Sequence, residues 1–220
     1  MRALAVTLAL AVVISQGPMP NAQSQQQAPS KGRLFPPLDL GLLERPDRVL
    51  WQKPEQIMDA LHVADGSTVA DIGAGAGFFT IRLANRVGPK GIVYAQDVQS
   101  LMLDAIRRRV QREGLRNVQT RQAHDNDPNL PAKALDAILM VDAYQEVANR
   151  VLYLRNHANA LKPKGRIGIV NWKPGRGGPG PDEPNERVER SVVEADAKAA
   201  GLRVVGEENL RYQYLLVLAP

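Results

Sequence analysis

The 220-residue chain contains no cysteine, which excludes disulfides, thiolate metal sites and cysteine nucleophiles. Histidine is scarce, and the spacing of His62, His124 and His157 is unlike that of metal ligands. Aromatic residues make up 5% of the chain, and none interrupts the basic stretch at 106–116, although base stacking requires them. Despite the net charge of +5, we interpret that stretch as the solvated side of a helix and predict neither nucleic-acid binding nor a zinc centre.

Apolar runs long enough to span a bilayer are also missing. The run at 3–14 follows Arg2 and is short for a span; helix-breaking glycine and proline residues come at 17, 18 and 20, and small residues at 22 and 24. This pattern predicts a secretory signal peptide at 1–24, with an uncleaved anchor as the alternative. Residues 25–33 are polar and glutamine-rich, which predicts a disordered linker.

The remaining residues, 34–220, are expected to form one folded domain. Its first part, 34–65, is predicted to be a helical cap with a helix at 53–63, in which Pro54 takes the first position and Ile57, Ala60 and Leu61 share one face. The core is expected at 66–220.

Strand-like and helix-like segments alternate through the core. We expect strands at 67–72, 91–98, 117–123, 135–141 and 165–171, and helices at 78–87, 99–114 and 146–161. Apolar strands separated by helices are typical of a parallel sheet covered on both faces. After a Gly/Pro-rich loop and a helix at 185–201, strands at 202–209 and 212–219 follow with no room for a crossover, so they must pair antiparallel.

The most informative stretch is "VADIGAGAGFF", in which Asp71 closes the first strand and Gly73, Gly75 and Gly77 lead into a helix. Ligands of open α/β sheets bind at the carboxyl ends of the strands, and glycine lets backbone approach them closely. A dinucleotide motif would need a glycine where Phe78 stands, and the carboxylate of Asp71 would repel pyrophosphate. The stretch therefore favours a cationic ligand, with a dinucleotide-dependent oxidoreductase as a weaker alternative.

This stretch resembles the glycine-rich first motif of class I S-adenosylmethionine-dependent methyltransferases. "VGPKGIVYAQDVQSLML", "LDAILMVDAYQEV" and "LKPKGRIGIVNWKPG" resemble further segments of a small bacterial branch, in the same order. The resemblance covers roughly residues 51–218. It implies a Rossmann-like, mostly parallel seven-stranded sheet with an antiparallel last strand and helices on both faces. It also implies S-adenosylmethionine as cofactor and methyl transfer to a small-molecule acceptor.

The resemblance assigns the cofactor site residue by residue. Asp71 and the loop would hold the methionine part, with Gly73, Ala74, Gly75 and Gly77 as the loop residues. Asp97 would accept the ribose hydroxyls and Val98 would pack on the adenine.

Further along the chain, Asp125, or less directly His124, would bind the adenine amino group, and Asp142 would face the methyl donor. Acids at strand ends also suit plain turns, and this alternative is strongest for Asp125 in "DNDPN".

The reacting groups are harder to assign. Similar chains often carry a histidine base after the fourth strand, but Gln145 occupies that position and cannot titrate. Asp142, Tyr144 and Glu146 are catalytic candidates by position, and Asn171 and Trp172 are candidates for the acceptor pocket. The Gly/Pro-rich loop at 173–184 is either a lid or a plain loop. No metal is predicted; magnesium held by Asp142 and Asn171 is the weaker alternative.

Two functions stay open at this point. The first is S-adenosylmethionine-dependent methylation of an unidentified small molecule, and the second is an exported, non-catalytic binding module on the same scaffold. The export signal conflicts with a cytoplasmic methyl donor, unless a later start such as Met19 is used. We therefore expect a periplasmic or secreted protein, or a cytoplasmic one if an internal start is used. The oligomeric state is not predicted.

Overall fold

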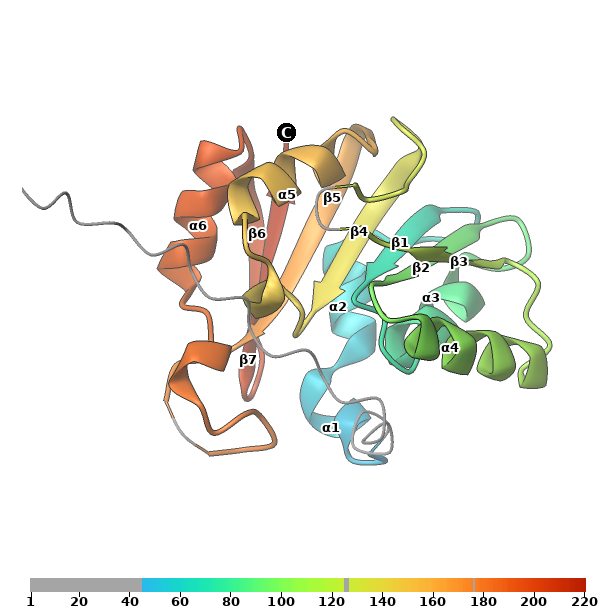
Figure 1. Ribbon diagram of the computed structural model, residues 1–220, viewed down its shortest axis with the longest axis horizontal. Helices are drawn as coiled ribbons and strands as arrows, with labels where there is room; N and C mark the ends of the chain where they lie inside the picture. The colour runs from blue at the N-terminus through green and yellow to red at the C-terminus, as the bar shows by residue number, and fades with distance from the viewer. Residues whose placement is uncertain (1–44, 125–126, 176) are drawn as a thin grey trace, which may run out of the picture.

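The fold is built on one seven-stranded sheet. The structure is a computed structural model, and it describes residues 45–124, 127–175 and 177–220. The strand order is β3-β2-β1-β4-β5-β7-β6, and β7 alone runs antiparallel to the other six strands (Figure 1). The strands are β1 (Thr68–Ile72), β2 (Ile92–Asp97), β3 (Val118–Gln122), β4 (Leu135–Val141), β5 (Leu161–Trp172), β6 (Arg203–Asn209) and β7 (Gln213–Ala219). The predicted Rossmann-like topology with its antiparallel last strand is confirmed.

Helices cover both faces of the sheet. They are α1 (Arg48–Gln52), α2 (Pro54–Ala60), α3 (Phe78–Val87), α4 (Ser100–Arg112), α5 (Arg150–Ala158) and α6 (Arg190–Ala199), with 3-10 turns η2 (Tyr144–Glu146) and η3 (Pro184–Glu186). Val93 of β2 packs in the hydrophobic cluster under α2 and α3. Ala95 lies two residues further along the strand, hence on the same face, and packs against α4. Tyr94 points to the opposite face, into the cluster under α5 and α6. The sheet is thus buried on both sides, as its apolar strands require.

The helix expected at 146–161 is shorter than the prediction. The side chain of Asn149 accepts a hydrogen bond from the N–H of Leu152 at 3.2 Å, so it caps a helix that starts at Arg150. Residues 144–146 form the separate turn η2, and Leu161 already begins β5.

The segment before the core packs directly on the sheet. The cluster that contains residues of β1 and β4 also buries Ile57, Met58 and Leu61 of the α2 region. Gly168 of β5 allows this packing, because a Cβ there would lie only 2.8 Å from the Leu61 side chain. The predicted signal peptide and linker, and positions 34–44 of the predicted cap, lie outside the described residues. Within the described residues, no helix has the length and apolar character needed to cross a membrane.

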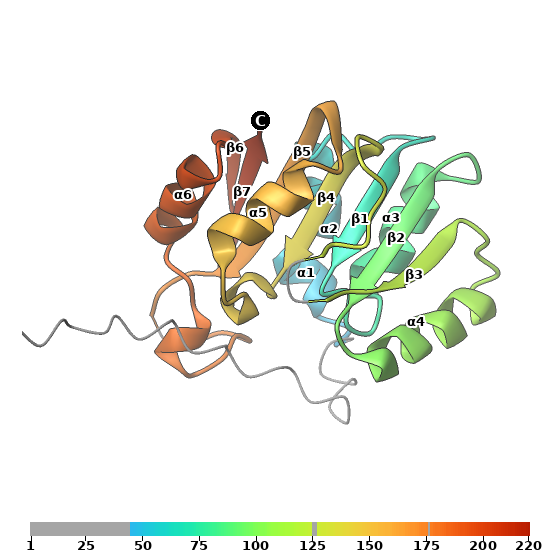
Figure 2. The same cartoon turned by 45° about the horizontal axis from the view of Figure 1, so that its top comes forward.

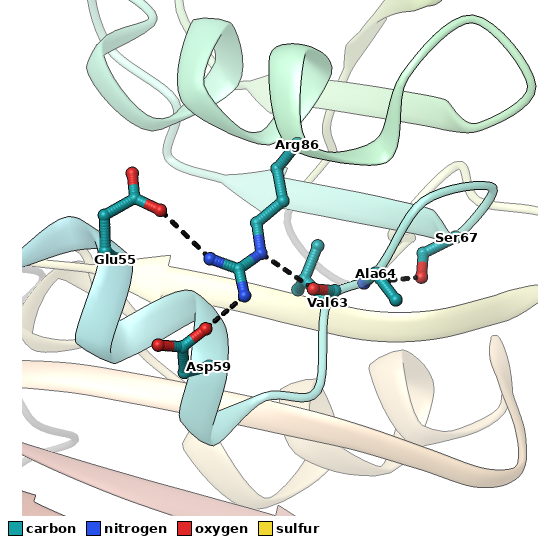
Figure 3. A network of polar contacts seen from close by, with 6 residues as sticks. All are labelled: Glu55, Asp59, Val63, Ala64, Ser67 and Arg86. Atoms are coloured by element: carbon teal, nitrogen blue, oxygen red, sulfur yellow. Dashed lines mark hydrogen bonds and ion pairs between the residues drawn. The ribbon is translucent and has the colours of Figure 1, made fainter.

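Arg86 joins α3 to α2 and to the turn that precedes β1 (Figure 3). Its Nε donates to the Val63 carbonyl at 2.8 Å, and its two other guanidinium nitrogens pair with Glu55, at 3.0 Å, and Asp59. The Arg86 side chain is about a quarter exposed, whereas those of Glu55 and Asp59 are mostly exposed, so the bond to the Val63 carbonyl is the best shielded of the three contacts.

We expect Arg86→Leu to lower the free energy of unfolding by about 1–2 kcal/mol, because it removes a charge-assisted bond to a carbonyl and two ion pairs. Urea denaturation of the full chain measures this loss. Arg108→Leu on the exposed side of α4 is the matched control and should change stability by less than about 0.5 kcal/mol. Equal losses in both variants would contradict the role of Arg86.

Candidate active site

Three acidic residues lie along the carboxyl edge of the sheet. Asp71, Asp97 and Asp142 stand at or directly after the ends of β1, β2 and β4, which are neighbours in the sheet. Both cartoon views show α1 beside the same edge (Figures 1 and 2). The edge is therefore the place where ligands of such sheets bind.

The glycine loop connects β1 to α3 and adopts left-handed backbone at each glycine, with φ of 65° at Gly73, 54° at Gly75 and 84° at Gly77. A Cβ at Gly73 would lie 2.5 Å from the Cβ of Ala143, so this glycine permits the close approach of the turn after β4. Gly75 donates its N–H to the Asp97 carboxylate at 3.0 Å. Ala74 is buried and donates to the carbonyl of Gln96 at 2.9 Å, which ties the loop to β2.

Asp71 is buried beneath this loop, with 3% of its surface exposed. Thr80 donates its hydroxyl to the carboxylate at 2.6 Å. Burial raises the pKa of Asp71 to about 6; the Thr80 hydrogen bond and the charge of Arg48 oppose the rise, and the charge of Asp97 adds to it. The carboxylate would thus be stabilised by a cation.

Asp97 shares its carboxylate between two backbone donors, Gly75 at 3.0 Å and Gln99 at 2.9 Å. Burial raises its pKa, against the effect of these hydrogen bonds. The next residue, Val98, is 44% exposed. A buried acid beside an exposed apolar side chain suits a ligand with hydroxyl groups and a flat apolar part.

Asp142 has an unusual backbone, with φ of 54°, and its carboxylate accepts the amide N–H groups of Gln213 at 2.7 and 2.9 Å. Burial raises the pKa of Asp142 to about 7, against the charge of Arg48, the hydrogen bonds from Gln213 and the charge of Arg187. Asp142 can therefore take up a proton near neutral pH.

Sequence reasoning missed Gln52 and Gln213. Both are completely buried, and the Gln52 amide donates to the Gln213 amide oxygen at 2.9 Å, across 161 residues of chain. No local pattern marks them: each follows an aromatic residue, Trp51 or Tyr212, but Gln145 likewise follows Tyr144.

The other catalytic candidates lie apart from Asp142. Tyr144 is fully buried, and its hydroxyl donates to Asp196 of α6 at 2.9 Å, which does not favour a catalytic role. Glu146 is partly buried near Asp97; burial, followed by the charges of Asp97 and Glu186, raises its pKa to about 7. Gln145 donates its amide to the backbone carbonyl of Asp142 at 2.5 Å.

Asn171 and Trp172 are adjacent in β5 and point to opposite faces of the sheet. Asn171 donates to the Tyr214 hydroxyl at 3.3 Å within the buried layer. Trp172 packs on Trp51, with ring centroids 5.4 Å apart, and Trp51 also contacts Tyr212 at 6.1 Å. The structure therefore places Trp172, but not Asn171, beside α1.

The loop after β5 is held by Arg187. Its guanidinium donates to the carbonyls of Lys173 at 2.9 Å, Pro181 at 2.9 Å and Gly177 at 3.4 Å. A Cβ at Gly180 would lie 2.7 Å from the Trp172 ring, so the loop lies directly on this ring. The loop after β5 therefore covers Trp172 on one side of the edge.

His124 is exposed, and its backbone pairs with that of Asp127. Asp125, the second predicted adenine contact, lies outside the described residues. Within the described ranges, no group of three or more potential metal ligands gathers at any point.

Comparison with known proteins agrees with this geometry. A family model described as "Methyltransferase domain" matches residues 69–165. A crystal structure of a SAM-dependent methyltransferase from Aquifex aeolicus is 31% identical, with a TM-score of 0.79, and the match covers 84% of this chain and 98% of that one. The chain belongs to the S-adenosylmethionine-dependent methyltransferases. S-adenosylmethionine is its cofactor.

Two curated relatives of this methyltransferase match over shorter stretches. The ubiquinone/menaquinone biosynthesis C-methyltransferase of Ectopseudomonas mendocina is 33% identical over 115 residues, which are 51% of this chain and 45% of that enzyme. Nocamycin O-methyltransferase of Saccharothrix syringae is 28% identical over 119 residues, 54% of this chain and 42% of that enzyme. The chain thus spans about half the length of the curated relatives it matches.

The residues of this methyltransferase fit the cofactor chemically. S-adenosylmethionine carries positive charge on its sulfonium and amino groups. Asp71 is buried and Asp142 is partly buried, and burial raises the pKa of both carboxyl groups, so a cation beside them would favour their ionised forms. Asp97 and the exposed Val98 offer an acceptor and an apolar surface side by side.

We expect Asp142→Asn to stabilise the protein by an amount that grows as pH rises above about 4 and levels off above about 7. Because burial raises the pKa of Asp142 to about 7, the folded state keeps a proton that the unfolded chain releases, so stability falls as pH rises from about 4 through 7. Asparagine stays neutral and tolerates positive φ. Urea denaturation should give equal stabilities near pH 4 and a gain of about 2–4 kcal/mol at pH 8. A gain independent of pH, or the same gain in the surface control Asp104→Asn, would contradict this account.

Proposed function

We propose that this protein transfers the methyl group of S-adenosylmethionine to a small-molecule acceptor at the carboxyl edge of the sheet, beside Asp142. The observation that carries the proposal is the position of Asp142, which follows β4 directly next to the glycine loop and has a pKa near neutrality. The two curated relatives, whose names refer to a quinone pathway and to nocamycin, support a small-molecule acceptor.

In this proposal the ends of β1 and β2 hold the cofactor. Asp71 and the backbone of Gly73, Ala74, Gly75 and Gly77 hold its methionine part, and Asp97 and Val98 hold the ribose and adenine. The hydrogen bond from Gly75 to Asp97 joins these two regions, so the loop and the ribose acceptor are aligned before the ligand arrives. Alignment of this kind is the main contribution of a protein to a displacement reaction.

The cofactor supplies an electrophilic methyl carbon on a sulfonium. The chain must then hold the acceptor in line and, for a hydroxyl or amine, remove its proton. Asp142 is suited to accept that proton, because its carboxylate is raised in pKa and retains lone pairs beyond the two bonds from Gln213. Gln145 does not take this role, since its amide is committed to the Asp142 carbonyl.

The acceptor would lie against the aromatic side of the edge. Trp51 and Trp172 contact each other there, and the loop pinned by Arg187 lies on Trp172. Movement of this loop would admit the acceptor and exclude water afterwards.

We expect calorimetric titration to show micromolar binding of S-adenosylmethionine and S-adenosylhomocysteine. Asp97→Ala should weaken both by about 10–100-fold, because hydrogen bonds to a charged acceptor are worth about 1.5–3 kcal/mol. Asp104→Ala, which removes a surface carboxylate paired with Arg107, is the control and should bind normally. If the unaltered protein binds neither compound, the glycine loop is only structural and the non-catalytic binding module becomes the better reading.

Affinity for S-adenosylmethionine should rise about tenfold between pH 6 and pH 8. Asp71 and Asp142 ionise in this window, and their carboxylates attract the cationic cofactor. S-adenosylhomocysteine lacks the sulfonium charge and should show a weaker dependence. Titrations across this range test the prediction, and identical pH profiles for the two compounds would contradict it.

We propose further that residues 1–24 are a signal peptide that directs export. The proposal rests on the sequence pattern, since these residues lie outside the described part of the chain. Mass spectrometry of the protein from its native cells should find a mature N-terminus near residue 25. An intact Met1, or a start at Met19, would refute cleavage.

A further inference from the structure

Four side chains form one line of hydrogen bonds from α1 to the carboxylate of Asp142. Arg48 donates from Nε to Gln52 Oε1 at 2.5 Å, and Gln52 donates from Nε2 to Gln213 Oε1 at 2.9 Å. Gln213 then donates from Nε2 to both carboxylate oxygens of Asp142, at 2.7 and 2.9 Å. The line connects an N-terminal helix to the last strand and ends at the group next to the glycine loop.

The groups at the two ends of this line of hydrogen bonds fix the donor-to-acceptor direction of every bond in it. A guanidinium can only donate hydrogen bonds, and an ionised carboxylate can only accept them. Each glutamine between them must therefore turn its oxygen toward Arg48 and its nitrogen toward Asp142. Both glutamines are fully buried, where an unsatisfied amide is costly, so this single arrangement is strongly preferred.

We propose that Gln213 is the positioning residue of the Asp142 carboxylate, and that Gln52 orients Gln213 from α1. This inference rests on the proposed function, in which Asp142 faces the cofactor and accepts a proton. The two bonds from one amide hold the carboxylate in one rotamer on a residue whose backbone is itself in the left-handed region.

A neutral amide is suited to this role for an electrostatic reason. The charged groups that face Asp142 are Arg48 of α1 and Arg187 after η3, and both act on it through charge. A cation in direct contact would favour the ionised carboxylate strongly and make it a poor base. The amide of Gln213 orients the carboxylate and favours ionisation only moderately, which leaves its proton affinity near neutrality.

Titration of the full-length protein with S-adenosylmethionine and S-adenosylhomocysteine from pH 5.5 to 8.5 tests the inference. The variants are Gln213→Leu and Gln52→Leu, and the control is Gln56→Leu, an exposed glutamine of α2 that donates to Glu208. Without its amide partner the carboxylate ionises less readily. In Gln213→Leu the midpoint for S-adenosylmethionine binding should move up by about one pH unit, with about threefold weaker binding at pH 7.5. S-adenosylhomocysteine binding should stay within about twofold.

Gln52→Leu should shift the midpoint in the same direction by a smaller amount, and Gln56→Leu should not shift it. An unchanged midpoint in Gln213→Leu, or equal weakening of both compounds, would overturn the inference, because a purely structural residue would act in that way. If Gln213→Leu does not fold, an unchanged midpoint in Gln52→Leu overturns it. Failure of the unaltered protein to bind either compound is a different result, which refutes the proposed function itself.

Discussion

The contact between the turn after β1 and the turn after β4 determines the geometry of the whole edge. Only a glycine at 73 leaves room for Ala143, and this approach brings the turn that follows Asp71 in β1 against the turn that contains Asp142. Because β1 and β4 are paired in parallel, the two turns point to the same side of the sheet. Any side chain at position 73 would separate the turns, and with them the carboxylates.

This arrangement buries charge that the protein itself compensates only in part. Asp71 has one hydroxyl donor, and Asp142 has neutral amide donors, with Arg48 acting on both through charge. Isolated carboxylates at such depth are unfavourable in the absence of a cation. A positively charged ligand beside these carboxylates would offset this cost, whereas a phosphate would add to it.

Much of the architecture could be predicted from the sequence, because it depends on local patterns. All seven strands lie where apolar runs between turns indicated them, and Asp71 and Asp97 stand at strand ends as expected. The start of α5 was wrong because Asn149 is a better cap than the residues before it, a competition that apolar spacing does not reveal. The roles of Gln52 and Gln213 could not be predicted from the sequence, since their contact joins segments 161 residues apart. Glutamine is uncharged, and neither residue belongs to a periodic pattern that would mark a site. The opposite directions of Asn171 and Trp172 follow from strand alternation, but which of them faces α1 depends on how the helices pack.

The aromatic contact between α1 and β5 has a further consequence for how the molecule can be observed. The chain contains two tryptophans, Trp51 and Trp172, and they are the two rings that meet at this edge. The indole emission of the native protein therefore arises wholly from one place, where α1, the end of β5 and the Gly/Pro-rich loop converge. A change in the position of α1 or of the Gly/Pro-rich loop alters the surroundings of both tryptophan side chains at once. The unmodified protein thus carries its own optical reporter of this edge, since no other indole contributes.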